Sequence, residues 1–286
     1  MAETWTVLKI LQWTAGYFKE KGIEGGRLDA EVLLANALGL DRVGLYLNFD
    51  RPLSADEQAV FRQQVSRRAR REPVQYILGE TEFWSLALRV SPDVLIPRAD
   101  TEVLVEEALK KGAGACSLLD VGTGSGAIAV ALASELPEAR IEAVDLSSAA
   151  LAVASDNARR HGVDGRIVFR EADLYGLNGG PFDLILSNPP YIPTGDMADL
   201  MPEVRDFEPQ LALRGGDDDG LAAYRSLAAA SARLLHPGGW LLVEVGIGQA
   251  DAVRRLFEQA GLSELYVRDD YAGVPRVVGG RKPVSI

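Results

Sequence analysis

The sequence predicts an α/β protein in which a doubly wound, seven-stranded, mostly parallel sheet follows a small helical domain and a β-hairpin. Strand-like and helix-like segments alternate from about residue 101 onward, as expected for a parallel sheet. A buried-strand pattern at 117–121 runs directly into a glycine-rich loop and then a helix. Residues 5–71, by contrast, carry apolar residues at helical spacing without alternation.

The composition is that of an ordinary globular protein and limits the possible partners. The chain has 286 residues, 47% of them hydrophobic, and 41 acidic residues against 30 basic ones give a net charge of −11. Binding of long nucleic acids is therefore not expected. A single cysteine, Cys116, and two histidines predict neither an internal disulfide nor a metal site. No signal-peptide or membrane-span pattern occurs, so a cytoplasmic location without membrane association is expected.

Residues 1–72 are predicted to form the helical domain. Ser54 and Glu57 have the spacing of a capping box, which predicts a helix from there to about residue 71. The end of this helix is rich in arginine, at positions Arg67, Arg68, Arg70 and Arg71. Because cations complement the negative end of a helix dipole, we interpret these arginines as a solvated helix end, with a partner-docking patch as the alternative.

Residues 73–90 are predicted to form a hairpin linker. Pro73 ends the preceding helix, and the segment after it is rich in β-type residues. Leu86, Leu88 and Val90 alternate, and Gly79-Glu80 is a plausible turn.

Residues 91–286 are predicted to form the α/β domain. Its strands are expected at 117–121, 140–144, 166–170, 182–187, 240–245, 265–268 and 276–278. Its helices are expected at 101–111, 127–136, 148–160, 221–235 and 250–260. This order predicts a sheet with helices on both faces and a ligand crevice at the carboxyl ends of its strands.

The glycine-rich loop predicts a nucleotide-like cofactor. Its residues are Gly122, Thr123, Gly124, Ser125 and Gly126, and glycines there let a ligand approach the backbone. Asp145, at the end of the next strand, is placed to accept hydrogen bonds from both hydroxyls of a ribose. The loop alone also fits a dinucleotide fingerprint, so a dehydrogenase stays open at this point.

Two carboxylates refine the cofactor prediction. Asp120 ends the first strand, where it can hold a ligand's ammonium group, and the glycines stand at alternate positions. Both features favour S-adenosylmethionine. Asp173 and Leu174, after the third strand, lie where the adenine ring would be flanked, although a simple strand-end turn explains that pair equally well.

The fourth strand ends in a second motif, which consists of Asn188, Pro189, Pro190 and Tyr191. Two prolines fix φ and remove donors, so the Asn188 side chain and the Pro189 carbonyl can act as a rigid pair of acceptors for a planar NH₂ group. Tyr191 offers an aromatic face for stacking. The motif predicts methyl transfer to an amide or aromatic amine, driven by orientation and charge stabilisation.

The combined motifs resemble the HemK/PrmC family of N5-glutamine methyltransferases, which methylate the glutamine of the Gly-Gly-Gln motif in class 1 peptide release factors. The resemblance covers essentially the full length. Its segments are Leu95–Glu102, Asp120–Gly126, Ser187–Tyr191, Phe207–Pro209, Ala212–Gly216, Asp219–Leu221 and Asp270–Val278.

The resemblance implies a Rossmann-like, class I domain that uses S-adenosylmethionine and a helical domain that recognises the release factor. It implies that the glycine loop and Asp145 bind the cofactor, with Leu174 flanking the adenine where some relatives have a larger aromatic residue. It implies further that Pro97 and Arg98 lie beside the methionine end of the cofactor. Asn188 and Pro189 would hold the substrate amide, and Asn188 would also contact the cofactor.

Several alternatives stay open. A sister enzyme that methylates a ribosomal-protein glutamine shares every motif and differs only in substrate recognition. An adenine-N6 methyltransferase fits the same two acceptors, but the net charge and the lack of a target-recognition domain disfavour it. A dehydrogenase or a non-enzymatic adaptor leaves the Asn188–Tyr191 motif without a role. Glu244 is equally consistent with fold support and with the site, and the oligomeric state is not predicted.

Overall fold

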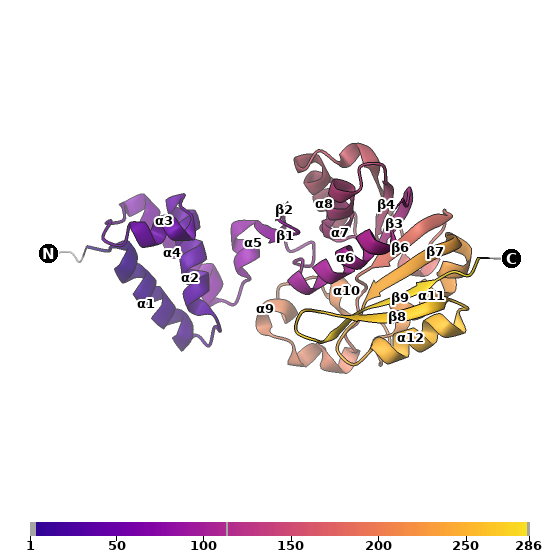
Figure 1. The fold of residues 1–286 in the computed structure, drawn as a ribbon. Helices are drawn as coiled ribbons and strands as arrows, with labels where there is room; N and C mark the ends of the chain where they lie inside the picture. The colour runs from indigo at the N-terminus through magenta and orange to yellow at the C-terminus, as the bar shows by residue number, and fades with distance from the viewer. Residues whose placement is uncertain (1–3, 113, 285–286) are drawn as a thin grey trace. The chain divides into compact units, whose positions relative to one another are not determined.

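A computed structural model describes residues 4–112 and 114–284, which divide into two compact units (Figure 1). The helical unit comprises the described residues up to Gly79 together with Pro202–Phe207. The α/β unit comprises Glu80–Met201 and the described residues from Glu208 onward, and it is called the catalytic unit because the sequence predicts methyl transfer there. The finer division at 72/73 and 90/91 stays a prediction.

The helical unit is built around one apolar core. Its helices are α1 (Val7–Glu20), α2 (Gly26–Leu38), α3 (Arg42–Leu47), α4 (Ala55–Ala69), α5 (Val74–Leu78) and, from the later segment, α9 (Pro202–Arg205). Phe18, Leu33, Leu45 and Phe61 are fully buried between them. The predicted capping box is confirmed, because Ser54 and Glu57 cap α4 reciprocally.

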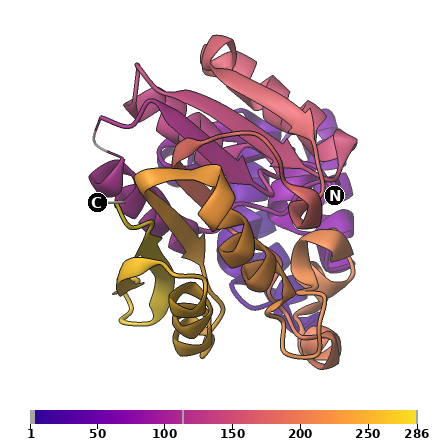
Figure 2. The ribbon, with the colours of Figure 1, turned by 90° about the vertical axis from the view of Figure 1, so that its right-hand side faces the viewer.

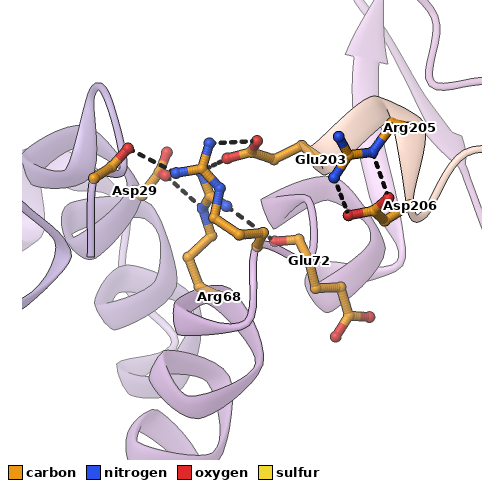
Figure 3. A network of polar contacts seen from close by, with 8 residues as sticks. Asp29, Arg68, Glu72, Glu203, Arg205 and Asp206 are labelled. Atoms are coloured by element: carbon orange, nitrogen blue, oxygen red, sulfur yellow. Dashed lines mark hydrogen bonds and ion pairs between the residues drawn. The ribbon is translucent and has the colours of Figure 1, made fainter. Parts of the chain in front are cut away.

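The arginine-rich end of α4 is not a solvated helix end. The Arg68 side chain is 7% exposed, and it donates to Asp29 of α2 at 2.7 Å and to Glu203 of α9 at 2.9 Å (Figure 3). Arg71 donates to the second oxygen of Glu203 at 2.8 Å. Of the four arginines only Arg70 is exposed, so the interpretation as a solvated helix end is wrong. It could not foresee these ion pairs, because the carboxylates come from distant parts of the sequence.

The predicted hairpin exists, but its turn was placed wrongly. Residues 74–78 form a helix, and the hairpin consists of β1 (Glu80–Phe83) and β2 (Leu86–Arg89). Pro73 is the N-cap of this helix, and Gly79 ends it in the left-handed conformation at φ +79°, as glycine commonly does at a helix C-terminus. Trp84 and Ser85 form the turn with φ of 54° and 56°, values that match a type I′ turn without its usual Asn-Gly signal.

The catalytic unit contains the predicted seven-stranded sheet, in the order β5-β4-β3-β6-β7-β9-β8. The strands are β3 (Ser117–Val121), β4 (Arg140–Asp145), β5 (Ile167–Glu171), β6 (Phe182–Ser187), β7 (Leu235–Glu244), β8 (Ser263–Asp269) and β9 (Pro275–Arg281). Among the described strands of this sheet, β9 pairs antiparallel with both β7 and β8, and the remaining pairs are parallel. β7 begins before the predicted residue 240, with a register shift against β6.

Helices cover both faces of this sheet (Figure 2). The longer ones are α6 (Glu102–Lys111), α7 (Ala127–Glu135), α8 (Ser148–Arg160), α11 (Ala222–Leu234) and α12 (Ala250–Gln259). The shorter ones are η1 (Ala99–Thr101), η2 (Asp164–Arg166), η3 (Leu174–Gly176), η4 (Thr194–Asp199) and α10 (Gln210–Leu213). Leu118 and Leu119, neighbours on β3, enter opposite cores, one with α6 and α7 and the other with α11 and α12.

The order of the strands fixes the position of the site. β3 lies between β4 and β6, so the chain reverses its direction of winding there and opens a crevice at the carboxyl ends of these strands. Within the described residues, none of the helices has the length and apolar character needed to cross a membrane.

Candidate active site

The end of β3 carries a buried carboxylate. Asp120 is fully buried, and its Oδ2 accepts a hydrogen bond from the Thr123 hydroxyl at 2.7 Å. Its other oxygen, Oδ1, has no hydrogen-bond partner among the described residues. Burial, together with the nearby Asp145 carboxylate, raises the pKa of Asp120 to about 7. A buried carboxylate with one free oxygen is a suitable binding site for a cation.

The glycine loop bends around this carboxylate. The Gly122 and Thr123 amides donate to the Val144 carbonyl at 2.9 and 3.0 Å, which ties the loop to β4. Gly122 and Gly124 have φ of +73° and +54°, and a Cβ on either would project into open space. On Gly126 a Cβ would lie 3.0 Å from Ala154 of α8. The first two glycines therefore expose backbone to a ligand, and the third allows two helices to pack closely.

Asp145 closes the other side of the loop. Its two carboxylate oxygens accept the Gly124 amide and the Ser147 amide, each at 2.9 Å. These bonds fix the plane of the carboxylate and leave lone pairs for further donors. Asp173, after β5, caps η3 by accepting the Tyr175 amide at 2.9 Å, and Leu174 packs partly buried beside it.

The Asn188–Tyr191 segment is held from three directions. The Ser187 hydroxyl donates to the Val121 carbonyl at 2.7 Å, which joins the ends of β6 and β3. Asn188 Nδ2 donates to the Thr101 hydroxyl oxygen at 3.1 Å, and the described residues offer its Oδ1 no donor. The Tyr191 carbonyl accepts from Gln249 Nε2 at 3.0 Å. The motif thus presents an unused amide oxygen at the strand end.

Thr101 links this motif to a second buried carboxylate. Its hydroxyl donates to Glu244 Oε2 at 2.6 Å, and the Glu244 side chain is buried at the end of β7. Burial raises the pKa of Glu244 to about 7, and it also raises the pKa of the neighbouring Tyr191 phenol. Glu244, which the sequence leaves equally consistent with fold support and with the site, is therefore connected to Asn188 through the Thr101 hydroxyl.

Arg98 is oriented by a residue that the sequence did not single out. Its guanidinium forms an ion pair with Glu208, which is buried and also accepts the Ile96 amide at 3.2 Å. Glu208 belongs to the Phe207–Pro209 segment and Thr101 to the Leu95–Glu102 segment. Both segments belong to the family resemblance, which is the signal in the sequence that points to Glu208 and Thr101.

These residues fit the S-adenosylmethionine predicted from the sequence. Asp120 Oδ1 is a free, buried carboxylate oxygen suited to an ammonium group. The space above Gly122 and Gly124 lets a ligand reach the backbone, and Asp145 is held to receive hydroxyl donors. A structural turn alone would leave the buried Asp120 oxygen unexplained.

Two family models match the chain. The model described as the PrmC N-terminal domain matches residues 9–79, and the methyltransferase small domain matches residues 99–202. The fold of the catalytic domain of hMettl16, solved in complex with the MAT2A 3′UTR hairpin 6, is similar with a TM-score of 0.59 and 14% identity. That similarity covers 76% of this chain and 81% of the other.

Full-length relatives define the family. A release factor glutamine methyltransferase from Geobacter sulfurreducens is 54% identical over 98% of both chains. The enzyme of the same name from Chlorobaculum tepidum is 43% identical over 96% of both. The chain therefore belongs to the PrmC/HemK family of release factor glutamine methyltransferases.

Proposed function

We propose that this protein transfers a methyl group from S-adenosylmethionine to the side-chain amide nitrogen, N5, of the glutamine in the Gly-Gly-Gln motif of class 1 peptide release factors. The observation that carries the proposal is the free Oδ1 of Asn188, fixed at a strand end beside the glycine loop. The names of the full-length relatives supply the substrate class.

The cofactor supplies an electrophilic methyl group on a sulfonium centre. In the proposal, Asp120 binds its ammonium group and the backbone of Gly122–Gly126, with Thr123 and Ser125, faces it. Asp145 accepts the ribose hydroxyls, and Asp173 and Leu174 flank the adenine. Pro97 and Arg98 lie beside its methionine end, where the ion pair with Glu208 keeps the guanidinium in place.

The substrate amide is a weak nucleophile because its lone pair is delocalised. In the proposal, its two N–H bonds donate to Asn188 Oδ1 and to the Pro189 carbonyl, so the face of the nitrogen is turned toward the methyl donor. The two acceptors stabilise the positive charge that develops on the NH₂ group during transfer. As the N–C bond forms, the methyl–sulfur bond would break with its electron pair left on sulfur, and one N–H proton would be released to water. Pro189 and Pro190 restrict the backbone, and the Tyr191 ring packs on the flat amide. The remaining rate enhancement comes from holding the amide nitrogen in line with the methyl group of the cofactor.

The division of labour follows the predicted domains. Residues 1–72 recognise the release factor, residues 73–90 link the two parts, and residues 91–286 carry out the transfer. Because release factors act on ribosomes, the protein would meet its substrate in the cytoplasm. The high net negative charge gives no reason to expect direct contact with nucleic acid.

Incubation with methyl-labelled S-adenosylmethionine tests the proposal. A purified class 1 release factor, a mixture of ribosomal proteins and duplex DNA are supplied in separate reactions. We expect label on the release factor, located by mass spectrometry at the amide of the Gly-Gly-Gln glutamine. A release factor with asparagine in place of that glutamine is the control and should stay unlabelled. Label only on a ribosomal protein or on DNA would contradict the proposal.

A further inference from the structure

A hydrogen-bonded chain of three side chains connects the interior of the catalytic unit to the substrate-binding motif. Glu244 Oε2 accepts from the Thr101 hydroxyl at 2.6 Å, and the Thr101 oxygen accepts from Asn188 Nδ2 at 3.1 Å. Thr101 is 4% exposed and Glu244 is 2% exposed, so solvent does not compete for these bonds. The three residues come from η1, β7 and the end of β6, which are distant in sequence.

The direction of each bond follows from the number of protons. A threonine hydroxyl has a single proton, and an ionised carboxylate can only accept. The Thr101 proton is therefore directed at Glu244, and the Thr101 oxygen can only accept from Asn188. Asn188 must then turn its NH₂ toward Thr101 and its Oδ1 away from it.

We propose that Thr101 and Glu244 are positioning residues that hold the Asn188 carboxamide in the one orientation that presents Oδ1 to the substrate amide. The inference rests on the proposed function, because it gives a use to the orientation of Asn188. A carboxamide rotated by 180° would present NH₂ to the NH₂ of the substrate, and two donors cannot bond to each other.

The surroundings of Glu244 allow it to act as the acceptor. Tyr224 donates to the main-chain carbonyl of Glu244 at 3.0 Å and not to its carboxylate. Arg276 on β9 is the nearby cation, but it bonds to Asp270 at 3.1 Å and to Asp100 at 3.0 Å. The Asp100 carboxylate opposes ionisation of Glu244, whereas Arg276 and Arg98 favour it, and the Glu244 carboxylate in turn raises the pKa of the Tyr191 phenol. The Thr101 hydroxyl is thus the direct donor to this carboxylate.

Protonation of Glu244 would release the orientation of Asn188. The protonated carboxyl can donate to the Thr101 oxygen, which frees the Thr101 proton to bond to Asn188 Oδ1 and favours the rotated amide. Because burial raises the pKa of Glu244 to about 7, the held orientation is complete above pH 7 and is lost as the pH falls through 7. Methyl transfer should follow the same dependence.

Kinetics of the full-length variants Thr101→Val and Thr101→Ser provide the first test. At pH 8 and saturating S-adenosylmethionine, Thr101→Val should lower kcat on a release factor about 10- to 100-fold, the effect of one charge-assisted hydrogen bond. Cofactor affinity should stay within about 3-fold of wild type, because Thr101 lies outside the proposed cofactor contacts. Thr101→Ser restores the hydroxyl and should restore kcat. Ser231→Ala removes a buried hydroxyl of α11 that bonds to Ala228, and it should leave kcat unchanged.

The pH profile of Glu244→Gln provides the second test. Glutamine can accept from Thr101 at every pH, so the acidic limb of kcat near pH 7 should be present in wild type and absent in this variant. In ¹⁵N-asparagine-labelled protein, the Asn188 side-chain resonances should shift through pH 7 in wild type only. This spectrum needs no substrate and also covers the case in which Thr101→Val does not fold.

The outcomes separate the inference from the proposed function. Unchanged kcat in a folded Thr101→Val variant, or an acidic limb and a moving Asn188 resonance that persist in Glu244→Gln, would overturn the positioning role. If the predicted resonance behaviour occurs and no release factor is methylated, the hydrogen-bonded chain stands and the substrate assignment fails.

Discussion

Two carboxylates of the helical unit, Glu31 and Glu203, and two at strand ends of the catalytic unit, Asp120 and Glu244, face opposite electrostatic surroundings. In the helical unit, Glu31 accepts from Arg42 and Tyr46, each at 2.8 Å, and Glu203 lies between Arg68 and Arg71. Although burial raises the pKa of both, their hydrogen bonds more than offset it, and both pKa values are lowered. In the catalytic unit, burial raises the pKa of Asp120 and Glu244 to about 7.

The difference separates structural from functional carboxylates. A paired carboxylate with a lowered pKa stabilises the fold, because its counter-ions come from neighbouring helices. Among the residues that the structure describes, Asp120 and Glu244 each make one side-chain hydrogen bond, and neither accepts from a guanidinium. Both stand at the carboxyl ends of strands, where the crevice opens. Carboxylates with a raised pKa at the carboxyl ends of strands indicate groups that bind a ligand or orient a neighbouring side chain.

Removing a counter-ion in the helical unit should have the largest effect on stability. We expect Arg68→Ala to lower the free energy of unfolding of that unit by about 3–5 kcal/mol, because Asp29 loses its partner and Glu203 keeps only Arg71. Urea titration with hydrogen-exchange mass spectrometry would assign the loss to α2, α4 and α9. Arg70→Ala, an exposed arginine of the same cluster, is the matched control and should change little. If both variants lowered the free energy of unfolding equally, the ion pairs of Arg68 would not be what stabilises the helical unit.

Removing a buried carboxylate from the catalytic unit, rather than a counter-ion, should stabilise the ligand-free protein. Asp120→Asn removes a carboxylate whose ionisation is unfavourable at pH 8, so the free energy of unfolding should rise by about 1–3 kcal/mol. Cofactor affinity should fall about 10- to 100-fold, because the ammonium group loses its charged partner. Melting curves and titration calorimetry give the two quantities, and a destabilised variant with normal affinity would refute the role of Asp120.

The pKa of Asp120 also sets the sign of the pH dependence of wild-type cofactor binding. An ammonium group favours the ionised carboxylate, so binding is strongest above pH 7 and weakens as the pH falls through 7. Between pH 8 and pH 6 the affinity should drop about 10-fold, with proton release on binding at pH 7. Calorimetry in buffers of different ionisation enthalpy measures that release, and Asp120→Asn should abolish it.

Exposed ion pairs should matter least. Arg225 pairs with Asp217 and Asp219 at the surface, where solvent screens the charges. We expect Arg225→Ala to shift Tm by less than about 2 °C and to leave methyl transfer unchanged. A large loss of methyl transfer would contradict this prediction and would show that the loop at 217–219 contributes to the active site.

Local patterns in the sequence predict most of the secondary structure and the order of the elements. Strands, helices and the glycine loop follow from neighbouring residues, and the Asn188–Tyr191 motif identified the strand end of the site. The turn at Trp84-Ser85 has positive φ at both positions without the asparagine or glycine that usually signals such a turn, so the sequence does not predict it. Pro73 and Gly79 bound a helix whose β-type residues favour a strand instead.

Partnerships between distant residues could not be predicted. Arg68 with Glu203, Arg98 with Glu208, and Thr101 with Glu244 are each more than 100 residues apart, and tertiary packing alone brings them together. Asp120 was expected from the sequence because it adjoins the glycine loop. Its free oxygen and raised pKa depend on the surrounding protein, and so does the orientation of Asn188.

The proposed role of Asn188 is tested most directly by single-turnover methyl transfer by Asn188→Ala, preloaded with S-adenosylmethionine and mixed with a release factor. We expect cofactor affinity within about 3-fold of wild type and a transfer rate at least about 100-fold lower, because one of the two acceptors for the amide is gone. Asn178→Ala, at an exposed loop position, is the control and should transfer at the wild-type rate. Transfer by Asn188→Ala at a rate close to wild type would contradict the proposed role of the Asn188–Tyr191 motif.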